Sequence, residues 1–338
     1  MATMFDVASA AGVSHQTVSR VVNGDPSVRP ATKAKVDAAI AQLAYRPSAA
    51  ARALASRRTR TIGLISTGFP HYGPSSTMHG FNGAARAAGY QVSMATLDAS
   101  DASGLRPAVD ALLGQDVAAL VVVAADAHTL EAVSALDPSV PLVVADAGDG
   151  PGRHAVSIDQ ALGARLVVEH LHGLGHRAIA HVRGPEPWTD AAERRRGWAE
   201  ACADLGVDAT VEVVGDWSPD SGHRAGLELA RRDDVTAVFC SNDQMAMGLV
   251  HALSDAGLRV PDDVSVVGFD DVPEAAHVVP PLTSVRQDFP ALGSLVVDVL
   301  IAAIEGREIP QNSRIPAELV VRDSSAAARP LDRDGHLR

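Results

Sequence analysis

A regular alternation of short β-branched runs with helical stretches begins at Thr61 and continues through most of the chain. Before Asp159, the runs TIGLIS, YQVSMAT, AALVVVA and PLVVAD are typical of buried strands, with helical stretches such as GLRPAVDALLGQ between them. After Asp159 the pattern repeats with HRAIAHVRG, ATVEVVGD, VTAVFCSND and DVSVVGFDD. Strands that alternate with helices form parallel sheets with both faces covered. The chain is therefore predicted to be an α/β protein whose body contains two doubly wound parallel sheets.

Bulk composition sets the broad class of the protein. The chain has 338 residues, 46% apolar and 21% charged, which is ordinary for two or three packed domains. No apolar run approaches the ~20 residues that a membrane span needs. The N-terminus lacks the basic start and apolar block of a secretory signal. Two cysteines, Cys202 and Cys240, do not make a disulfide framework. We therefore expect a cytoplasmic protein without a membrane partner.

Charge is distributed unevenly along the chain. The first sixty residues contain nine basic and three acidic residues, a net charge of +6. Because the whole chain carries −12, the remainder carries −18. A small basic segment on a large acidic body indicates a module that binds a polyanion, joined to a body with another task.

The segment DVASAAGVSHQTVSRVVNG within this basic region is typical of two short helices that cross closely. Thr3 and Asp6 have the spacing of a capping box, and Gly12 can adopt the left-handed conformation of a tight turn. Ser14 is predicted to cap the second helix, and a third helix is predicted from about Pro30. The residues expected to face inward are Val7, Ala8, Ala11, Val18, Val21, Ile40 and Leu43.

The polar face of the second predicted helix consists of donors and acceptors that can reach base edges or phosphates: His15, Gln16, Thr17, Ser19 and Arg20. An ordinary amphipathic hairpin is the alternative interpretation. The local charge of +6 favours nucleic acid, because phosphate contact is the obvious use of such charge. Residues 46–60 follow, with no large apolar side chain beyond Leu54. An isolated helix of this length is marginal, so a flexible linker is an open alternative there.

Polar and aromatic side chains follow the predicted strands of the body. The positions are Asp146, Trp188, Asp190, Arg194, Trp217, Asn242, Asp243, Gln244 and Asp270. Ligands of such sheets bind outside the carboxyl ends of the strands. Carboxylates, an amide, an arginine and an indole suit a polyol, because planar groups bond to hydroxyls and a sugar ring stacks on the indole. Helix capping just after a strand is the alternative role of any single Asp or Asn.

Other motifs give little support for catalysis or for a metal. GDGPG at residues 148–152 lacks the spacing of a dinucleotide-binding loop, and neither a nucleophile elbow nor a phosphate loop is present. The stretch HLHGLGHRAIAH clusters His170, His172, His176 and His181, but without the cysteine or carboxylate partners of a typical zinc site. We expect no enzyme activity, no cofactor and no metal.

The N-terminal segment and the segment VRPATKAKVDAAIAQLAYRPSAAARALASRRTRTIGLI together resemble the lac repressor family of bacterial transcription regulators, and the match continues to about residue 323. The resemblance implies a helix–turn–helix head over 1–46 and a hinge helix over 47–60. It also implies a core over 61–323 with the two-lobed architecture of periplasmic binding proteins. One lobe would comprise about 61–158 and 289–316, and the other about 159–287 and 317–323. Residues 324–338 are predicted to be a flexible tail.

The resemblance also implies a double-stranded, near-palindromic operator bound by a homodimer. His15, Gln16 and Arg20 would read bases in the major groove. Leu54 would insert between base steps in the minor groove, where apolar wedges kink DNA. Contacts to the phosphate backbone would come from Thr17, Ser19, Asn23, Thr32 and Lys33. The tail has no leucine heptads, so we expect a dimer rather than a tetramer.

For the effector, the resemblance implies a small sugar between the lobes. Arg194, Asn242 and Asp270 match positions that contact sugar hydroxyls or ring oxygens, and Trp217 and Phe289 match aromatic residues beside the cleft. His71 and Asp190 depart from the usual pattern at the pocket mouth. The full set of predicted contacts is His71, Asp146, Asp190, Arg194, Trp217, Asn242, Gln244, Asp270 and Phe289. A galactoside is the leading expectation.

Two other classes of function fit part of the sequence. A periplasmic sugar-binding protein has the two-lobed body but would need a signal peptide and would not carry a basic head. Some members of the family bind purine corepressors, and some respond to a phosphoprotein partner. Trp217 and the set Arg194, Asn242 and Asp270 favour a sugar over these effectors.

Overall fold

The computed structural model divides into two compact units, Met1–Arg60 and Thr61–Arg338. The residues that the structure describes are 2–22, 25–45, 59–68, 70–98, 102–145, 154–209, 211–309 and 312–329. Three predicted site residues, Asn23, Leu54 and Asp146, lie outside these ranges, as does most of the predicted hinge.

The first unit, here called the head, contains three short helices. They are α1 (Met4–Ala11), α2 (His15–Val22) and α3 (Pro30–Gln42). Thr3 and Asp6 form the predicted capping box, and Gly12 ends α1 with a φ of 64°. Val7, Val18 and Val36 are completely buried at the centre, and Ile40 and Leu43 pack against them from the edge. This small core fixes which face of α2 points outward.

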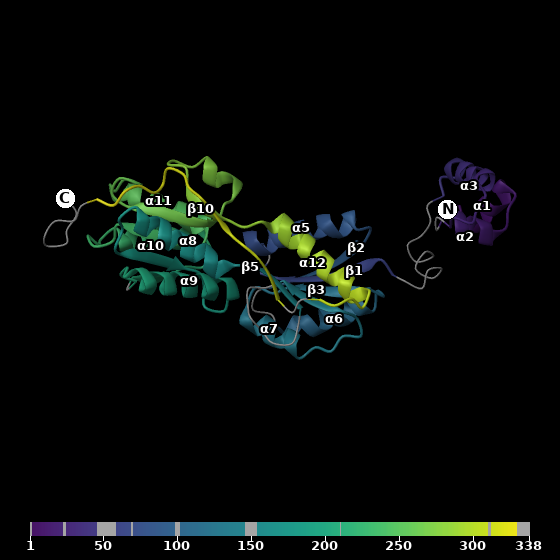
Figure 1. Ribbon diagram of the computed structural model, residues 1–338, viewed down its shortest axis with the longest axis horizontal. Coiled ribbons are helices and arrows are strands. Elements are labelled where there is room, and N and C mark those ends of the chain that lie inside the picture. Colours follow the sequence, from purple (N-terminus) through teal and green to yellow (C-terminus); the bar gives the residue numbers. More distant parts are fainter. Residues whose placement is uncertain are drawn as a thin grey trace. The chain divides into compact units, whose positions relative to one another are not determined.

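The second unit, here called the body, contains two six-stranded sheets with helices on both faces (Figure 1). The first sheet has the order β11-β5-β4-β3-β1-β2, and all of its neighbouring strands are parallel. Its strands are β1 (Thr61–Thr67), β2 (Gln91–Leu97), β3 (Ala119–Val123), β4 (Leu142–Ala145), β5 (His154–Ile158) and β11 (Asn312–Ile315). Its helices are α5 (Tyr72–Ala87), α6 (Leu105–Leu113), α7 (Ala127–Ser134) and α12 (Phe289–Ile304), with a 3-10 turn at Ala102–Gly104. We call this half the N-lobe.

The second sheet has the order β12-β10-β9-β8-β6-β7 and forms the C-lobe. Its strands are β6 (Ile179–Arg183), β7 (Glu212–Val214), β8 (Ala237–Cys240), β9 (Ser265–Asp270), β10 (Thr283–Arg286) and β12 (Glu318–Val320). Its helices are α8 (Gln160–Gly173), α9 (Thr189–Leu205), α10 (Pro219–Leu229) and α11 (Asp243–Asp255), with a 3-10 turn at Pro273–Ala276. The edge strand β12 is antiparallel to β10, which the expectation of purely parallel sheets did not include.

Alternate residues of the central strands explain why these segments form sheets with two covered faces. Ile62 and Val121 belong to the core under α5 and α12, which lie side by side in Figure 1. Leu120 and Val122 belong to the core under α6 on the opposite face. Both faces are therefore apolar, and the strands are the continuous hydrophobic runs expected of buried parallel strands.

The chain passes between the two sheets three times, after β5, after β10 and after β11. In addition, the loops that follow β3 and β6 meet directly. The amide of Ala127 donates to the carbonyl of Pro187 at 3.0 Å, and that of Thr189 donates to the carbonyl of Ala125 at 3.2 Å. The carboxyl ends of the two sheets therefore face each other across a narrow crevice.

The segment from Ser324 differs from the predicted flexible tail. Ser324 is fully buried, accepts a hydrogen bond from the Thr283 amide at 2.8 Å and donates to the Val266 carbonyl at 2.6 Å. The Ala328 amide donates to the Leu174 carbonyl at 2.8 Å. The prediction is thus wrong for residues 324–329, because small hydroxyl side chains there satisfy backbone groups of the C-lobe. No helix in the described part of the chain is long and apolar enough to cross a membrane.

Candidate functional site

The outer face of α2 is polar and accessible. Val18 and Val21 are buried, whereas His15, Gln16 and Arg20 are exposed, with Thr17 and Ser19 half-buried beside them. The Ser14 hydroxyl accepts a hydrogen bond from the Thr17 amide at 3.2 Å, which caps α2 as predicted. This arrangement makes α2 a helix whose exposed face can enter a DNA groove.

Two contacts on the head were not evident from the sequence. The ring of His15 stacks on Phe5 with centroids 5.3 Å apart, which restrains one of the predicted base-reading side chains. Lys33 forms an exposed ion pair with Asp37 at 2.7 Å. Such a pair is worth only ~0–1 kcal/mol, so it is a weak competitor for a phosphate. Thr32 lies half-buried beside Lys33 near the start of α3.

In the body, Arg194 is the most contacted of the predicted ligand residues. It lies in the second turn of α9 and is only 3% exposed. Its Nε donates to Gln160 Oε1 at 2.8 Å, and its Nη1 donates to the carbonyl of Ser241. The guanidinium lies 3.8 Å from the Asp190 carboxylate and 3.7 Å from that of Asp270. Arg194 is therefore held inside the crevice and is not a solvent-exposed helix residue.

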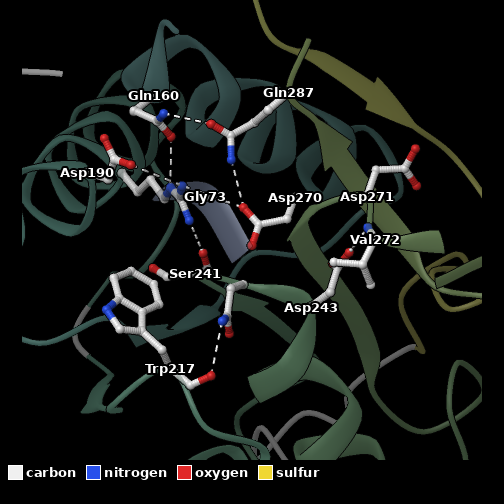
Figure 2. A network of polar contacts seen from close by, with 12 residues as sticks. Gly73, Gln160, Asp190, Trp217, Ser241, Asp243, Asp270, Asp271, Val272 and Gln287 are labelled. Atoms are coloured by element: carbon white, nitrogen blue, oxygen red, sulfur yellow. Dashed lines mark hydrogen bonds and ion pairs between the residues drawn. The ribbon is translucent and has the colours of Figure 1, made fainter. Parts of the chain in front are cut away.

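A chain of side-chain amides connects Arg194 to Asp270. Gln160 donates from Nε2 to Gln287 Oε1 at 2.8 Å, and Gln287 donates from Nε2 to Asp270 Oδ1 at 2.7 Å (Figure 2). Gln160 begins α8 and Gln287 follows β10, so both stand where the chain passes between the lobes. Neither residue was predicted from the sequence. The network therefore joins the two crossing segments to the predicted ligand contacts.

Asp270 combines backbone strain with an unusual protonation equilibrium. Its φ is +107°, a conformation that side-chain-bearing residues rarely adopt and that is found at functional sites. Burial raises the pKa of the Asp270 carboxyl to about 7, although Arg194 and Gln287 both favour its ionised form. Burial also raises the pKa of Asp190. Near neutral pH the site therefore contains a carboxyl group that can either donate or accept a hydrogen bond.

This pKa predicts how stability depends on pH. An unfolded aspartate has a pKa near 3.8, so between about pH 4 and pH 7 the folded state binds more protons at Asp270. The free energy of unfolding should therefore fall as pH rises through this window. In Asp270→Asn, the free energy of unfolding measured by urea denaturation should decrease less between about pH 4 and pH 7 than in the wild type. Asp298→Asn, at an exposed position on α12, is the control. Identical slopes for wild type and both variants would contradict the assignment.

A second buried carboxylate stabilises the loop after β9. Asp243 accepts a hydrogen bond from the Ser284 hydroxyl at 2.6 Å. It also accepts one from the Val272 amide at 2.8 Å (Figure 2). Burial raises the pKa of Asp243 to about 8. Asp271 pairs with Arg286 and Arg322, each at 2.7 Å. These contacts hold the strained segment that carries Asp270, so their role is structural.

Two indole rings stand on one side of the crevice. Trp188 packs edge-on against Trp217 at 5.4 Å and against the ring of His71 at 5.0 Å. Trp217 has a φ of +71°, and a Cβ on Gly184 would lie only 2.2 Å from its ring. Gly184 is therefore required to seat this indole. Trp217 is 7% exposed, and its Nε1 makes no hydrogen bond to any described residue. This donor can therefore serve a ligand.

The pocket beside Trp188 and Asp190 is small. Its volume is about 40 Å³, which suits a few water molecules, whereas ligand pockets usually have ~300–1,000 Å³. Of the predicted ligand residues, Asp190 and Phe289 line it, together with Trp188 and Gln287. The lobes must separate, or side chains must move, before a sugar can occupy this space.

Two predicted residues have other tasks in this structure. Asn242 caps α11 by accepting from the Met245 amide at 2.9 Å, and its amide donates to the Trp217 carbonyl at 3.1 Å. It also donates to Gln244 Oε1 at 2.9 Å. The capping alternative therefore describes Asn242, although it stands directly beside the loop that carries Trp217.

Three of the four clustered histidines of the sequence make hydrogen bonds through their rings within the C-lobe. His170 bonds to Ser325 at 2.9 Å and His176 to Thr236 at 2.8 Å. His181 bonds to Ser241 at 2.8 Å and stacks on Phe239, and burial lowers its pKa to about 3. His170 and His176 thus both contact the segment at Ser325 and Ala326, whereas His181 contacts Ser241.

Comparison with known proteins places this geometry in a family. Residues 3–48 match the bacterial regulatory proteins of the lacI family, and residues 168–325 match a periplasmic binding protein-like domain. The lactose operon repressor of Escherichia coli (strain K12) is 36% identical over 327 residues, which is 96% of this chain and 91% of that protein. The chain belongs to the lacI family.

Other members of the lacI family agree with this assignment. The ribose operon repressor of Escherichia coli (strain K12) is 36% identical over 309 residues, covering 90% of this chain and 93% of that protein. A crystal structure of the lac repressor dimer bound to operator and the anti-inducer ONPF superposes with a TM-score of 0.89. It is 35% identical, covering 96% of this chain and 99% of that chain. The predicted family and fold class, a helix–turn–helix head with a two-lobed body, are confirmed.

Proposed function

We propose that this chain is a transcriptional repressor that binds near-palindromic operator DNA as a homodimer and responds to a small sugar in the crevice. Its role is regulatory rather than catalytic. The observation that carries the proposal is the combination, in one chain, of a basic head and a crevice. The head exposes Gln16 and Arg20 on α2, and the crevice buries Arg194 between Asp190 and Asp270. Relatives that are repressors support the same combination.

The chemistry of the crevice favours a polyol as the effector. Arg194 supplies planar donors, Asp190 and Asp270 supply acceptors, and Trp217 supplies a stacking face with a donor at its edge. In the closed crevice, Arg194 is satisfied by Gln160 and by the Ser241 carbonyl. A sugar hydroxyl could accept the hydrogen bonds that Arg194 now donates to these groups, whereas an apolar ligand would leave buried polar groups unpaired. A galactoside is the leading candidate, by analogy with the lactose operon repressor.

The small volume of the crevice suggests how the effector acts. A sugar cannot fit in about 40 Å³, so its binding requires a different arrangement of the lobes or of the side chains that line the space. The contacts Ala127 to Pro187 and Thr189 to Ala125 would change as the crevice opens. The sugar can alter operator binding only if its affinity differs between the two arrangements of the body. A coupling of ~1–3 kcal/mol would change operator affinity ~5–150-fold.

The full chain and a random pool of DNA duplexes test the proposal. Duplexes retained by the chain should share a near-palindromic site. A panel of galactosides, glucosides, ribose and purines should then contain a sugar that alters the affinity for that site. Retention of no common sequence would refute the repressor function. A purine that acts where every sugar fails would refute the effector class.

We predict that base contacts and phosphate contacts come from different residues of the head. Arg20→Ala should weaken binding to the selected site by ~1–3 kcal/mol and relax its sequence preference, because Arg20 is exposed on the face of α2. Lys33→Ala should weaken binding to every duplex and reduce the salt dependence, because a phosphate contact carries no sequence information. Fluorescence anisotropy on selected and scrambled duplexes measures both. If Arg20→Ala lowered both affinities equally, Arg20 would not be a base-reading residue.

A further inference from the structure

Three side chains of types that can bind a metal ion lie close together on the surface of the C-lobe, away from the crevice residues described above. His223 lies on α10, and His251 and Asp255 lie one turn apart on α11. His223 Nε2 is 3.2 Å from Asp255 Oδ2, and His251 Nε2 is 3.6 Å from the same oxygen. One ligand atom of each residue lies within 4.8 Å of the others. His223 is half-buried, and the other two are exposed.

The packing of the two helices holds this group together. A Cβ on Gly222 would lie 2.0 Å from the Met245 carbonyl oxygen, and one on Gly248 would lie 1.9 Å from that of Pro219. Only glycine permits so close an approach. The backbones of α10 and α11 are therefore fixed against each other, which places His223 opposite Asp255. Sites on rigid elements in close contact keep their ligand geometry well.

The distances suit a tetrahedral transition metal ion. Bonds of ~2.0–2.2 Å from a tetrahedral Zn²⁺ place its ligand atoms roughly 3.3–3.6 Å apart. The two distances to Asp255 are 3.2 and 3.6 Å. The ligand atoms of His223 and His251 lie within 4.8 Å of each other. Imidazole nitrogen with one carboxylate oxygen is a ligand set that Zn²⁺ accepts, whereas Ca²⁺ and Mg²⁺ prefer oxygen alone.

The local field also favours a cation. Asp255 is the last residue of α11, where the helix dipole is negative and carbonyl groups lack partners within the helix. Without an ion, the His223 ring can donate from Nε2 to the Asp255 carboxylate at 3.2 Å. A metal ion satisfies the same three groups while both imidazoles are neutral.

We propose that His223, His251 and Asp255 bind one Zn²⁺ ion, with the fourth position open to water. The ion links α10 to α11 and thereby stabilises the C-lobe, because an unfolded chain does not hold the three ligands together. The proposal is independent of the sugar crevice.

Co²⁺ is the spectroscopic probe for the site. The untagged full chain, stripped of metal by a chelator, should bind one equivalent of Co²⁺ with the visible absorption of a tetrahedral complex. One equivalent of Zn²⁺ should remove that absorption. Zn²⁺ should also raise the melting temperature of the body.

Variants decide where the ion binds. His251→Asn changes an exposed side chain, so folding is preserved, and it should lower Zn²⁺ affinity by more than the roughly 10–100-fold that an outer-shell partner costs. Asp255→Asn should do the same, and both should lose the Zn²⁺-induced rise in melting temperature. His128→Asn, at an exposed position on α7, is the matched control and should behave as wild type. Absence of Co²⁺ absorption in the wild type, or unchanged Zn²⁺ affinity in His251→Asn and Asp255→Asn, would overturn the proposal.

Discussion

The Arg194→Ala protein is expected to bind operator normally and to lose its response to the sugar. Arg194 is 3% exposed and lies between Asp190 and Asp270 in the crevice, whereas the head that binds DNA is a separate unit. Truncating one partner of a buried, hydrogen-bonded charge pair costs ~2–5 kcal/mol. The sugar concentration needed for half of the response should rise by about 30-fold or more.

Arg196 provides a matched control on the same helix. Its guanidinium is exposed and pairs with Glu193 at 2.6 Å and with Glu200 at 3.0 Å. Such surface pairs contribute little, so Arg196→Ala should keep the wild-type response. Operator occupancy against sugar concentration, measured for both variants, distinguishes the two positions. A normal response curve for Arg194→Ala would remove Arg194 from the ligand site.

Gly248→Ala is expected to destabilise the protein strongly, because Gly248 lies where α10 packs against α11. Gly248→Ala would place a Cβ 1.9 Å from the Pro219 carbonyl oxygen and 2.9 Å from the amide nitrogen of His223. Both neighbours are backbone atoms, so relief requires the helices to move apart. Overpacking in a core typically costs ~1–3 kcal/mol, and we expect a loss of at least about 2 kcal/mol in the free energy of unfolding.

Gly83→Ala is the matched substitution within a different helix. Gly83 lies inside α5, and a Cβ there would meet no atom within 4 Å beyond its chain neighbours and the backbone of its own helix. Alanine is better than glycine in an open helix interior by roughly 0.5–1 kcal/mol, so this variant should be slightly more stable than wild type. Urea denaturation of both proteins gives the comparison. Equal effects of the two substitutions would show that α10 and α11 do not pack as described.

Local signals in the sequence were sufficient for much of the fold. Thr3, Asp6 and Gly12 fix the ends of α1 through contacts within a few residues, so the head could be predicted from spacing alone. The apolar runs that form β1 and β3 are buried on both faces and are recognisable without knowledge of their neighbours. The edge strands β11 and β12 are short and only partly apolar, so their existence depends on pairing with distant segments.

The position of a candidate site residue could be predicted where that residue follows a buried strand. Asp270 ends β9, and Arg194 lies one turn into the helix after β6, so the topology alone brings both to the crevice. Gln160 and Gln287 carry no such signal, because they meet across 127 positions of sequence at the crossings between lobes. The packed segment after Ser324 is similar, since its hydrogen bonds run to strands some forty to sixty residues earlier. Contacts of this kind depend on the tertiary arrangement, which the local pattern does not contain.

The central claim is that a sugar in the crevice and operator on the head share one equilibrium. Linkage requires that operator change the affinity for the sugar by the same factor by which the sugar changes the affinity for operator. Trp217 and Trp188 line or adjoin the crevice, so their fluorescence can report sugar binding to the full chain. The decisive measurement is this sugar titration with and without a saturating concentration of the selected operator duplex. The account predicts dissociation constants that differ by ~5–150-fold and match the effect on operator. Identical constants in the two titrations would contradict it.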